Sequence, residues 1–265
     1  EIGSVTGEPC AGNPKPRLWR LKKAKGLVVY YGLKNDGCVA VSSRLKGRRI
    51  EIPLGVSVAK TNCKETVEDE AGIKDYVKAM RTFVEAGIGS YYTINISCPN
   101  AYGGQLFHDE KRLDRLLKEI DKIDVRGKPV FLKISPDLSE KEIDGVIRAT
   151  GKHRVDGFIL TNLTKKNNSK IVESLPGVGG ISGKPLQELS DEVLRYFYKK
   201  TGGKYVLVGC GGIFSAEDAY KKIRNGASLV ELMTGMIFDG PQVMSSINLG
   251  LVKFLKRDGF KSISE

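Results

Sequence analysis

The chain has 265 residues, of which 40% are apolar and 31 are glycine, enough for one large α/β domain with a sizeable core. Lys and Arg outnumber Asp and Glu by 43 to 31, which gives a formal net charge of +12. The basic residues are spread along the chain, without an RNA-recognition, helix-turn-helix or aromatic-basic pattern. We therefore expect a solvated basic surface with weak attraction to phosphate or anionic lipid, and no nucleic-acid partner.

The cysteines and histidines exclude several kinds of site. The five cysteines are dispersed without a C-x-x-C pair, which indicates reduced intracellular thiols. With only His108 and His153, a multi-histidine metal site is impossible, and we expect no metal. No apolar run is long enough to span a bilayer and no signal-peptide pattern is visible. We expect an intracellular protein, cytoplasmic or peripheral on the inner face of the membrane.

Short apolar, β-branched runs alternate with amphipathic stretches along the whole chain. In chain order, the runs predict strands at Glu1–Ser4, Ile50–Val58, Tyr91–Ser97, Val130–Ile134, Phe158–Thr161, Tyr205–Gly209 and Leu229–Met233. The stretches between them predict helices at Ile73–Glu85, Lys111–Ile123, Ser139–Thr150, Leu186–Thr201, Ala216–Asn225 and Pro241–Asp258. This alternation predicts a parallel sheet with right-handed crossovers.

The predicted fold class is α/β, a (β/α)8 TIM barrel. The seven predicted strands are one fewer than a closed barrel needs. Because the chain opens inside a predicted strand and lacks an initiator Met, we expect the first strand to be missing from it. No linker or composition break divides the chain, so we predict one barrel domain over residues 1–265.

Polar residues or glycine turns lie at or just after the ends of the predicted strands. They are Ser57, Asn95, Cys98, Lys133, Thr161-Asn162, Gly209-Cys210-Gly211-Gly212 and Thr234-Gly235. Active sites of repeating β/α proteins are built at the carboxyl ends of strands, so we expect these groups to converge on one mouth of the barrel.

The segment Asn95-Ile96-Ser97-Cys98-Pro99-Asn100 is the most informative of these strand ends. Two Asn amides can grip a planar ligand that has carbonyl and N–H edges, and the thiol can act as nucleophile or general base. The alternative is a small buried cysteine beside two asparagines that make turn hydrogen bonds.

The last two turns predict a phosphate site. Gly211-Gly212 allows the backbone to approach an anion, and a helix that begins near Ser215 would present its N-terminal amides. Met233-Thr234-Gly235 adds amides and a hydroxyl. For Lys133, near the end of an apolar strand, two interpretations are equally supported: an ammonium that snorkels to the rim, or one that points into the mouth.

Together these segments resemble the dihydroorotate dehydrogenase family, closest to its quinone-linked class. The resemblance rests on Gly3-Ser4-Val5-Thr6, Gly12-Asn13-Pro14-Lys15-Pro16-Arg17-Leu18, the Asn95–Asn100 segment, Lys133-Ile134-Ser135-Pro136-Asp137-Leu138, Thr161-Asn162, Gly180 to Leu186 and Gly209 to Gly212. It implies an FMN-dependent barrel that oxidises dihydroorotate to orotate in pyrimidine biosynthesis, with a quinone as acceptor and peripheral membrane association.

The resemblance also implies roles for individual residues. FMN would be bound by Ser4, Ser57, Asn95, Lys133, Thr161, Gly183, Gly212, Met233 and Thr234. The substrate would be bound by Asn95, Asn100 and Asn162. Cys98 would be the catalytic base, and Lys133 would stabilise negative charge on the reduced ring.

The chain departs from the family pattern at several positions. Cys98 stands where the quinone-linked class usually has Ser, and Ser57 where it usually has Asn. Val29 replaces a substrate-binding Asn, and the family's first strand and N-terminal helical element are absent. Two alternatives therefore stay open: an FMN oxidoreductase that acts on another cyclic amide such as a dihydropyrimidine, or a truncated non-catalytic barrel. Fumarate and NAD remain alternative electron acceptors.

Overall fold

The computed structural model describes residues 1–103, 106–167, 169 and 171–265, with only the backbone of Leu106. These residues form two compact units. The first comprises Glu1–Arg17, Tyr30–Ile134 and Leu138–Gly157, and the second comprises Leu18–Val29, Ser135–Asp137 and Phe158–Glu265. Each unit therefore combines segments that are distant in the sequence.

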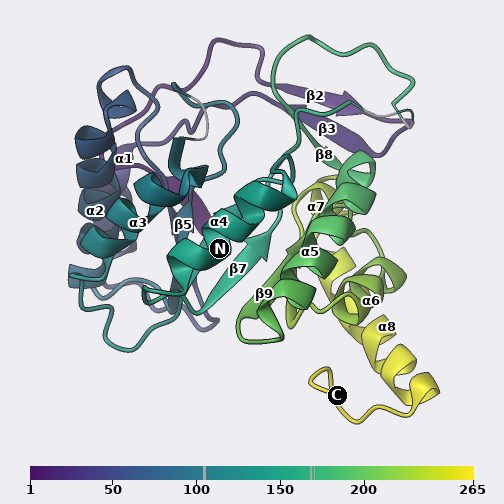
Figure 1. Ribbon diagram of the computed structural model, residues 1–265. Helices are drawn as coiled ribbons and strands as arrows, with labels where there is room; N and C mark the ends of the chain where they lie inside the picture. The colour runs from purple at the N-terminus through teal and green to yellow at the C-terminus, as the bar shows by residue number, and fades with distance from the viewer. Residues whose placement is uncertain (104–105, 168, 170) are drawn as a thin grey trace. The chain divides into compact units, whose positions relative to one another are not determined.

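The first unit is built on a parallel sheet with the strand order β1-β4-β5-β6, of which β5 is labelled in Figure 1. These strands are β1 (Ile2–Val5), β4 (Gly55–Val58), β5 (Tyr91–Asn95) and β6 (Val130–Ile134). One face of the sheet is apolar and fully buried: it carries Val56, Val58, Tyr92, Ile94, Val130, Leu132 and Ile134. Burial of these branched and aromatic side chains is the main force that holds this sheet to its helices.

Four helices of the first unit pack in succession, α1 on α2, α2 on α3 and α3 on α4. They are α1 (Gly37–Leu45), α2 (Asp69–Glu85), α3 (Glu110–Ile120) and α4 (Glu140–Thr150), with single 3-10 turns at Glu65–Val67 and Leu106–His108. The N-terminus of α4 is fixed by a capping box, in which the Ser139 hydroxyl accepts from the Glu142 amide and the Glu142 carboxylate accepts from the Ser139 amide.

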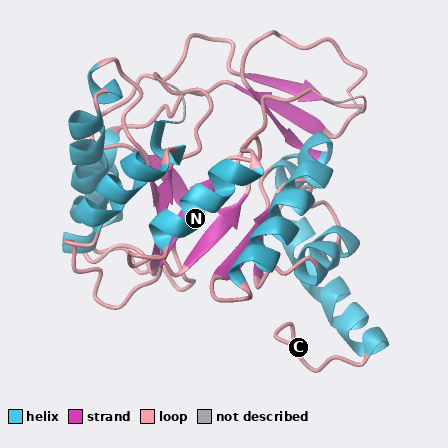
Figure 2. Cartoon of the chain, viewed as in Figure 1, coloured by secondary structure: helices cyan, strands magenta, loops and turns pink. Residues whose placement is uncertain are grey.

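The second unit contains two groups of strands. The strands β7 (Gly157–Leu160), β9 (Val206–Cys210) and β10 (Leu229–Glu231) lie in that order, with β9 and β10 parallel. The strands β2 (Leu18–Leu21), β3 (Gly26–Val29) and β8 (Gly180–Gly183) form a separate antiparallel sheet, which Figure 2 shows as three magenta arrows at the upper right. This small sheet joins segments that are far apart in the chain, since Leu27 of β3 is the register partner of Ser182 of β8.

The helices of the second unit follow its strands. They are a 3-10 turn at Lys184–Leu186, α5 (Gln187–Thr201), α6 (Ala216–Arg224), α7 (Thr234–Asp239) and α8 (Gln242–Asp258). A core cluster of Ile213, Ala219, Val243, Ile247 and Leu251 joins α6 to α8. In the described part of the chain, no helix combines the length and the apolar character that crossing a membrane requires.

Most predicted strands and helices are confirmed, with ends shifted by a few residues. The strand predicted at Ile50–Val58 is wrong in its first half, because β4 starts at Gly55, and Ile50 and Ile52 are 40% and 73% exposed. The small β2-β3-β8 sheet and the helices α1 and α7 were not predicted.

Candidate active site

The second face of the first unit's sheet carries the rings of Tyr91 and Phe131 but is otherwise polar. The strand register pairs Ser57 with Thr93 and Asn95 with Lys133, and paired residues on neighbouring strands point to the same face. Thr93 is fully buried, and Ser57 and Asn95 are 2% and 7% exposed. Because burying polar side chains without partners is costly, a polar sheet face of this kind is typical of a ligand site rather than of a core.

Hydrogen bonds join three of the predicted site residues on this face. The hydroxyls of Ser4 and Ser57 are 2.8 Å apart, and Asn95 Nδ2 donates to Ser4 Oγ at 2.8 Å. Asn95 Oδ1 accepts from the amide and the hydroxyl of Ser97 at 3.1 and 2.9 Å. These bonds fix which edge of the Asn95 carboxamide donates and which accepts.

Lys133 is held on the same face by an acidic partner. Its side chain is 18% exposed, and its ammonium lies 3.9 Å from Glu1 Oε1, whose side chain is 14% exposed. Glu1 Oε2 accepts from the Thr93 hydroxyl at 2.5 Å. The Lys133 ammonium therefore lies beside Glu1 on this face and does not extend into solvent.

Cys98 borders a small cavity just beyond the end of β5. The cavity has a volume of about 10 Å3, and its walls include Cys98, Lys60, Tyr76 and Asn95. That volume is enough for a single water molecule. Tyr76 donates from its hydroxyl to the Asn95 carbonyl at 2.8 Å, and burial raises the pKa of Tyr76. The half-buried Cys98 thus lies among polar groups and not in a purely aliphatic environment.

Lys60 gives this cavity its charge. The residue is 4% exposed, and burial lowers the pKa of its ammonium. Negative charge at Cys63, Cys98 and Asp75 opposes that shift. Lys60 therefore brings a buried basic side chain to the wall of the same cavity that Cys98 borders.

The loop that carries Cys98 is anchored by side chains that the sequence did not single out. Lys60 Nζ donates to the Tyr102 carbonyl at 2.8 Å, and Asn62 Oδ1 accepts from the Tyr102 amide at 2.6 Å. Asn13 Nδ2 donates to the Asn100 carbonyl at 3.2 Å, and Asn62 Nδ2 donates to Asn13 Oδ1 at 3.2 Å. Lys60 lies two residues after the buried strand β4, and Asn13 lies in the Gly12–Leu18 segment, but neither was assigned to the site.

In the second unit, two predicted site residues follow β7. The Thr161 amide donates to the Cys210 carbonyl at 2.7 Å, which ties the end of β7 to the end of β9. Asn162 is half-buried, and its Oδ1 accepts from the Leu163 amide at 2.8 Å. Both side chains therefore lie at a strand end, as the sequence predicted.

Two of the residues predicted to bind FMN in the second unit are glycines at which a side chain has no room. Gly183 has φ +87°, and a Cβ there would lie 2.4 Å from the Lys25 carbonyl oxygen. Gly212 has φ +74°, and a Cβ there would lie 2.4 Å from Gln187 Cβ. Thr234 is buried at the start of α7, and its hydroxyl is 2.8 Å from that of Ser182. The Met233 side chain is 66% exposed.

The helix α6 differs in detail from the predicted anion site. Its capping box uses the amides of Ser215 and Asp218, and the Asp218 carboxylate also accepts from the Phe214 amide at 2.8 Å. Burial would raise the pKa of Asp218, but hydrogen bonds from Lys184 and Gln187 lower it overall. Within the predicted anion site, the Ser215 amide is therefore occupied by the Asp218 carboxylate and the Asp218 amide by the Ser215 hydroxyl.

Val29, the position at which the resemblance implies a substrate-binding Asn, is the last residue of β3. It pairs in register with Leu18 and with Gly180, inside the small antiparallel sheet. The isopropyl group of Val29 can neither donate nor accept a hydrogen bond, so it cannot make the contacts that an Asn carboxamide would make with a ligand.

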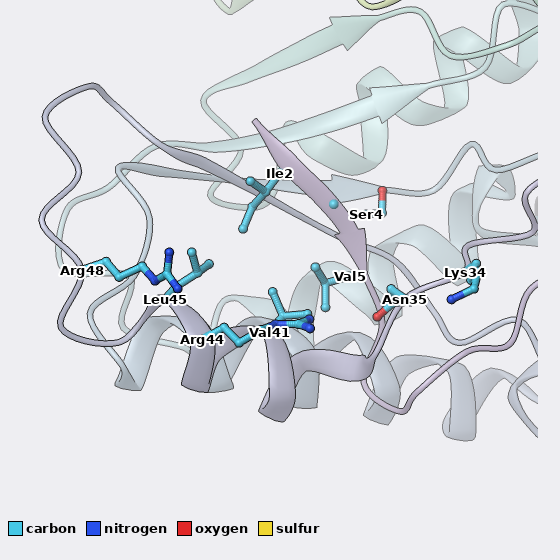
Figure 3. A pocket seen from close by; sticks show the side chains of 10 residues that line it. Ile2, Ser4, Val5, Lys34, Asn35, Val41, Arg44, Leu45 and Arg48 are labelled. Carbon is cyan, nitrogen blue, oxygen red and sulfur yellow. The ribbon is translucent and has the colours of Figure 1, made fainter.

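A larger pocket of about 450 Å3 lies beside β1 and α1 (Figure 3). Its walls are Ile2, Gly3, Ser4, Val5, Lys34, Asn35, Val41, Arg44, Leu45 and Arg48. Ser4 is the predicted site residue that borders it, and Arg44 bonds to Asp36 at 2.7 Å. The larger pocket is therefore distinct from the small cavity beside Cys98.

Comparison with known proteins gives a consistent result. The model of the dihydroorotate dehydrogenase family matches residues 1–255. Dihydroorotate dehydrogenase (quinone) of Natronomonas pharaonis is 37% identical over 266 residues, which cover 100% of this chain and 73% of that protein. The corresponding protein of Crocosphaera subtropica is 38% identical over 277 residues, covering 100% of this chain and 72% of its own length.

Solved structures agree with the sequence relatives. The crystal structure of DHODH in complex with ferulenol from Eimeria tenella superposes with a TM-score of 0.90 and 29% identity. The match covers 100% of this chain and 76% of the Eimeria chain. It confirms the predicted α/β fold of TIM-barrel type. The chain belongs to the dihydroorotate dehydrogenase family of oxidoreductases.

Proposed function

We propose that this protein oxidises dihydroorotate to orotate in pyrimidine biosynthesis, with bound FMN and a quinone as electron acceptor. The observation that carries the proposal is the polar sheet face of the first unit, on which Asn95 and Lys133 are register partners. Family membership supports the substrate, since the relatives are named dihydroorotate dehydrogenase (quinone).

The residues present fit FMN. Gly183 and Gly212 have positive φ values, and a glycine backbone without Cβ atoms can approach a phosphate closely. Lys133 places an ammonium on a buried polar face, where it would balance negative charge on a reduced ring. Ser4, Ser57, Asn95, Thr161, Met233 and Thr234 complete the proposed FMN set.

When bound, FMN would supply the two-electron acceptor for the hydride that the substrate loses. Cys98 Sγ would accept the proton from the neighbouring ring carbon, so that a hydride and a proton leave together and a C=C bond forms. Asn95, Asn100 and Asn162 would bind the carbonyl and N–H edges of the substrate. Lys60, which borders the same cavity as Cys98, would place a positive charge near this thiol.

Steady-state assays test the electron acceptor. Orotate formation is measured with a soluble ubiquinone analogue, fumarate or NAD as the only acceptor. The proposal predicts turnover with the quinone and much slower turnover with fumarate and NAD. Turnover that depends on NAD would instead assign the protein to a different electron-transfer partner.

Val29 favours a second candidate, oxidation of another cyclic amide such as a dihydropyrimidine. Loss of an amide partner typically costs about 1–3 kcal/mol for the ligand atoms left unpaired. Comparing flavin reduction by dihydroorotate, dihydrouracil and dihydrothymine in the natural protein and in Val29→Asn distinguishes the two. Under the first proposal dihydroorotate is fastest in both proteins, and Val29→Asn increases its apparent affinity.

A further inference from the structure

A buried network on α5 and α6 lies directly behind the Gly211–Gly212 turn. Lys222 is fully buried, and its ammonium lies 2.8 Å from Asp191 Oδ1 and 2.5 Å from Ser190 Oγ. Asp191 is 2% exposed and Ser190 is fully buried. None of these three residues has a role in the chemistry described above.

The hydrogen bonds of this network have a defined direction. An ammonium can only donate, so Ser190 Oγ accepts from Lys222 and must give its single hydrogen to another acceptor. That acceptor is the Cys210 carbonyl at 2.7 Å, which also accepts from the Thr161 amide at 2.7 Å. The last carbonyl of β9 is thus held by two donors, one from α5 and one from the end of β7.

Holding this carbonyl restricts the turn that follows it. A peptide group is planar, so a fixed Cys210 carbonyl also fixes the amide of Gly211 and the direction in which the chain enters the turn. Space is equally limited, because a Cβ on Gly211 would lie 2.9 Å from Ser190 Oγ and one on Gly209 would lie 3.1 Å from Lys222 Cβ. The backbone of the turn therefore rests directly on the network.

A role in positioning explains this network better than a role in overall stability. Burial lowers the pKa of Lys222, while Asp191 raises it in opposition, so the ammonium is retained at a cost. Buried ion pairs are often no more stabilising than apolar residues of the same volume, and their best-supported use is to specify one conformation.

We propose that Lys222, Ser190 and Asp191 hold the Cys210–Gly212 turn in the conformation that binds the phosphate of FMN. The inference rests on the proposed function, because it requires that this turn binds phosphate. The three side chains are positioning residues and would not touch the phosphate themselves.

Fluorescence titration of the apoprotein with FMN and with riboflavin, which lacks the phosphate, tests the inference. Ser190→Ala and Lys222→Met should each weaken FMN binding by about threefold to tenfold, the equivalent of one hydrogen bond. Riboflavin binding should change by less than about twofold. The ratio of the two affinities therefore reports on the phosphate and not on general damage to the fold.

Lys221→Met is the matched control. Lys221 is the neighbouring lysine and pairs with the same carboxylate, at 2.9 Å from Asp191 Oδ2, but its side chain is 52% exposed. Its replacement should leave both affinities unchanged. Ser190→Ala leaves the Lys222–Asp191 pair intact, so it tests the inference even if Lys222→Met fails to fold.

Each other outcome contradicts the inference in a recognisable way. If FMN and riboflavin affinities fall equally, the network supports the whole fold and not the phosphate turn. If neither affinity changes in Ser190→Ala, the Cys210 carbonyl does not need this support. Natural protein that binds neither flavin would overturn the proposed function as well, whereas normal binding with unaffected variants overturns the network alone.

Discussion

At the scale of single residues, the proposed chemistry depends most on Cys98. Replacing it with Ala removes the proton acceptor but leaves the Asn95 and Lys133 side chains in place. We expect Cys98→Ala to reduce the rate of flavin reduction by dihydroorotate by about a hundredfold to ten-thousandfold, the usual range for a general base. Flavin affinity should be unaffected. The measurement is anaerobic stopped-flow absorbance.

Cys63→Ala is the control for this variant, because Cys63 is another half-buried thiol of the first unit. In Cys63→Ala, dihydroorotate should reduce the bound flavin at the same rate as in the natural protein. Equal rates of flavin reduction in Cys98→Ala and in the natural protein would show that Cys98 is not the proton acceptor.

His108 makes a separate prediction about pH and stability. Burial lowers the pKa of His108 to about 4, and in the described residues its Nε2 has no hydrogen-bond partner. A folded-state pKa below the unfolded value means that the unfolded chain binds the proton more tightly. The contribution of neutral His108 to the free energy of unfolding is therefore complete above about pH 6.5 and is lost as the pH falls towards 4.

The prediction is tested by urea unfolding of the natural protein and of His108→Leu at pH 7.5 and pH 5. Between these two pH values this one group should cost the natural protein about 2 kcal/mol of unfolding free energy. The leucine variant should lack that component of the pH dependence. An identical pH dependence in both proteins would show that folding does not lower the pKa of His108.

Sequence reasoning found residues of this site where local rules apply. Ser57, Asn95 and Lys133 lie near strand ends, and alternation along a strand puts their side chains on one face. Glu1 and Asn62 were missed because their partners, Thr93 and Tyr102, are far away in the sequence. No local pattern reports such a contact.

At the scale of secondary-structure elements, the Gly212 turn makes the sharpest prediction. Gly212→Ala combines a positive φ with a Cβ 2.4 Å from Gln187 Cβ. We expect it to lower the unfolding free energy by at least about 2 kcal/mol and to weaken FMN binding. Gly202→Ala is the matched control, since Gly202 has φ +58° with nothing within 4 Å of its Cβ.

Gly202→Ala should lower the unfolding free energy only by the cost of a positive φ, about 1 kcal/mol. It should have no effect on flavin binding. Thermal and urea denaturation compare the stabilities, and fluorescence titration compares the affinities. A Gly212→Ala protein with the stability and FMN affinity of Gly202→Ala would contradict the close packing of the turn.

Elements were predictable where their pattern was strong and local. The strand Val130–Ile134 was predicted to the residue, because its apolar run is bounded clearly on both sides. The sheet β2-β3-β8 was not predicted, because its strands have only four residues each and β8 pairs with β3 across a long sequence separation. The helix α1 lacked a side-chain cap at Asp36 and begins with a glycine, so it gave no start signal.

At the scale of the whole molecule, the net charge of +12 predicts attraction to anionic membranes. In co-sedimentation, the protein should bind vesicles that contain phosphatidylserine more than neutral phosphatidylcholine vesicles. This binding should be strong at roughly 0.1 M salt and largely lost at roughly 1 M, because the screening length shortens from about 10 to 3 Å. Binding that is equal on neutral vesicles, or insensitive to salt, would contradict an electrostatic attachment.

The central claim is that this chain binds FMN and uses it to oxidise dihydroorotate. The most direct measurement is anaerobic titration of the FMN-loaded protein with dihydroorotate, followed by the visible absorbance of the flavin. The account predicts that the absorbance bleaches completely and that about one orotate forms per bound flavin, as two-electron transfer requires. Flavin that is bound but stays oxidised in excess dihydroorotate would contradict it.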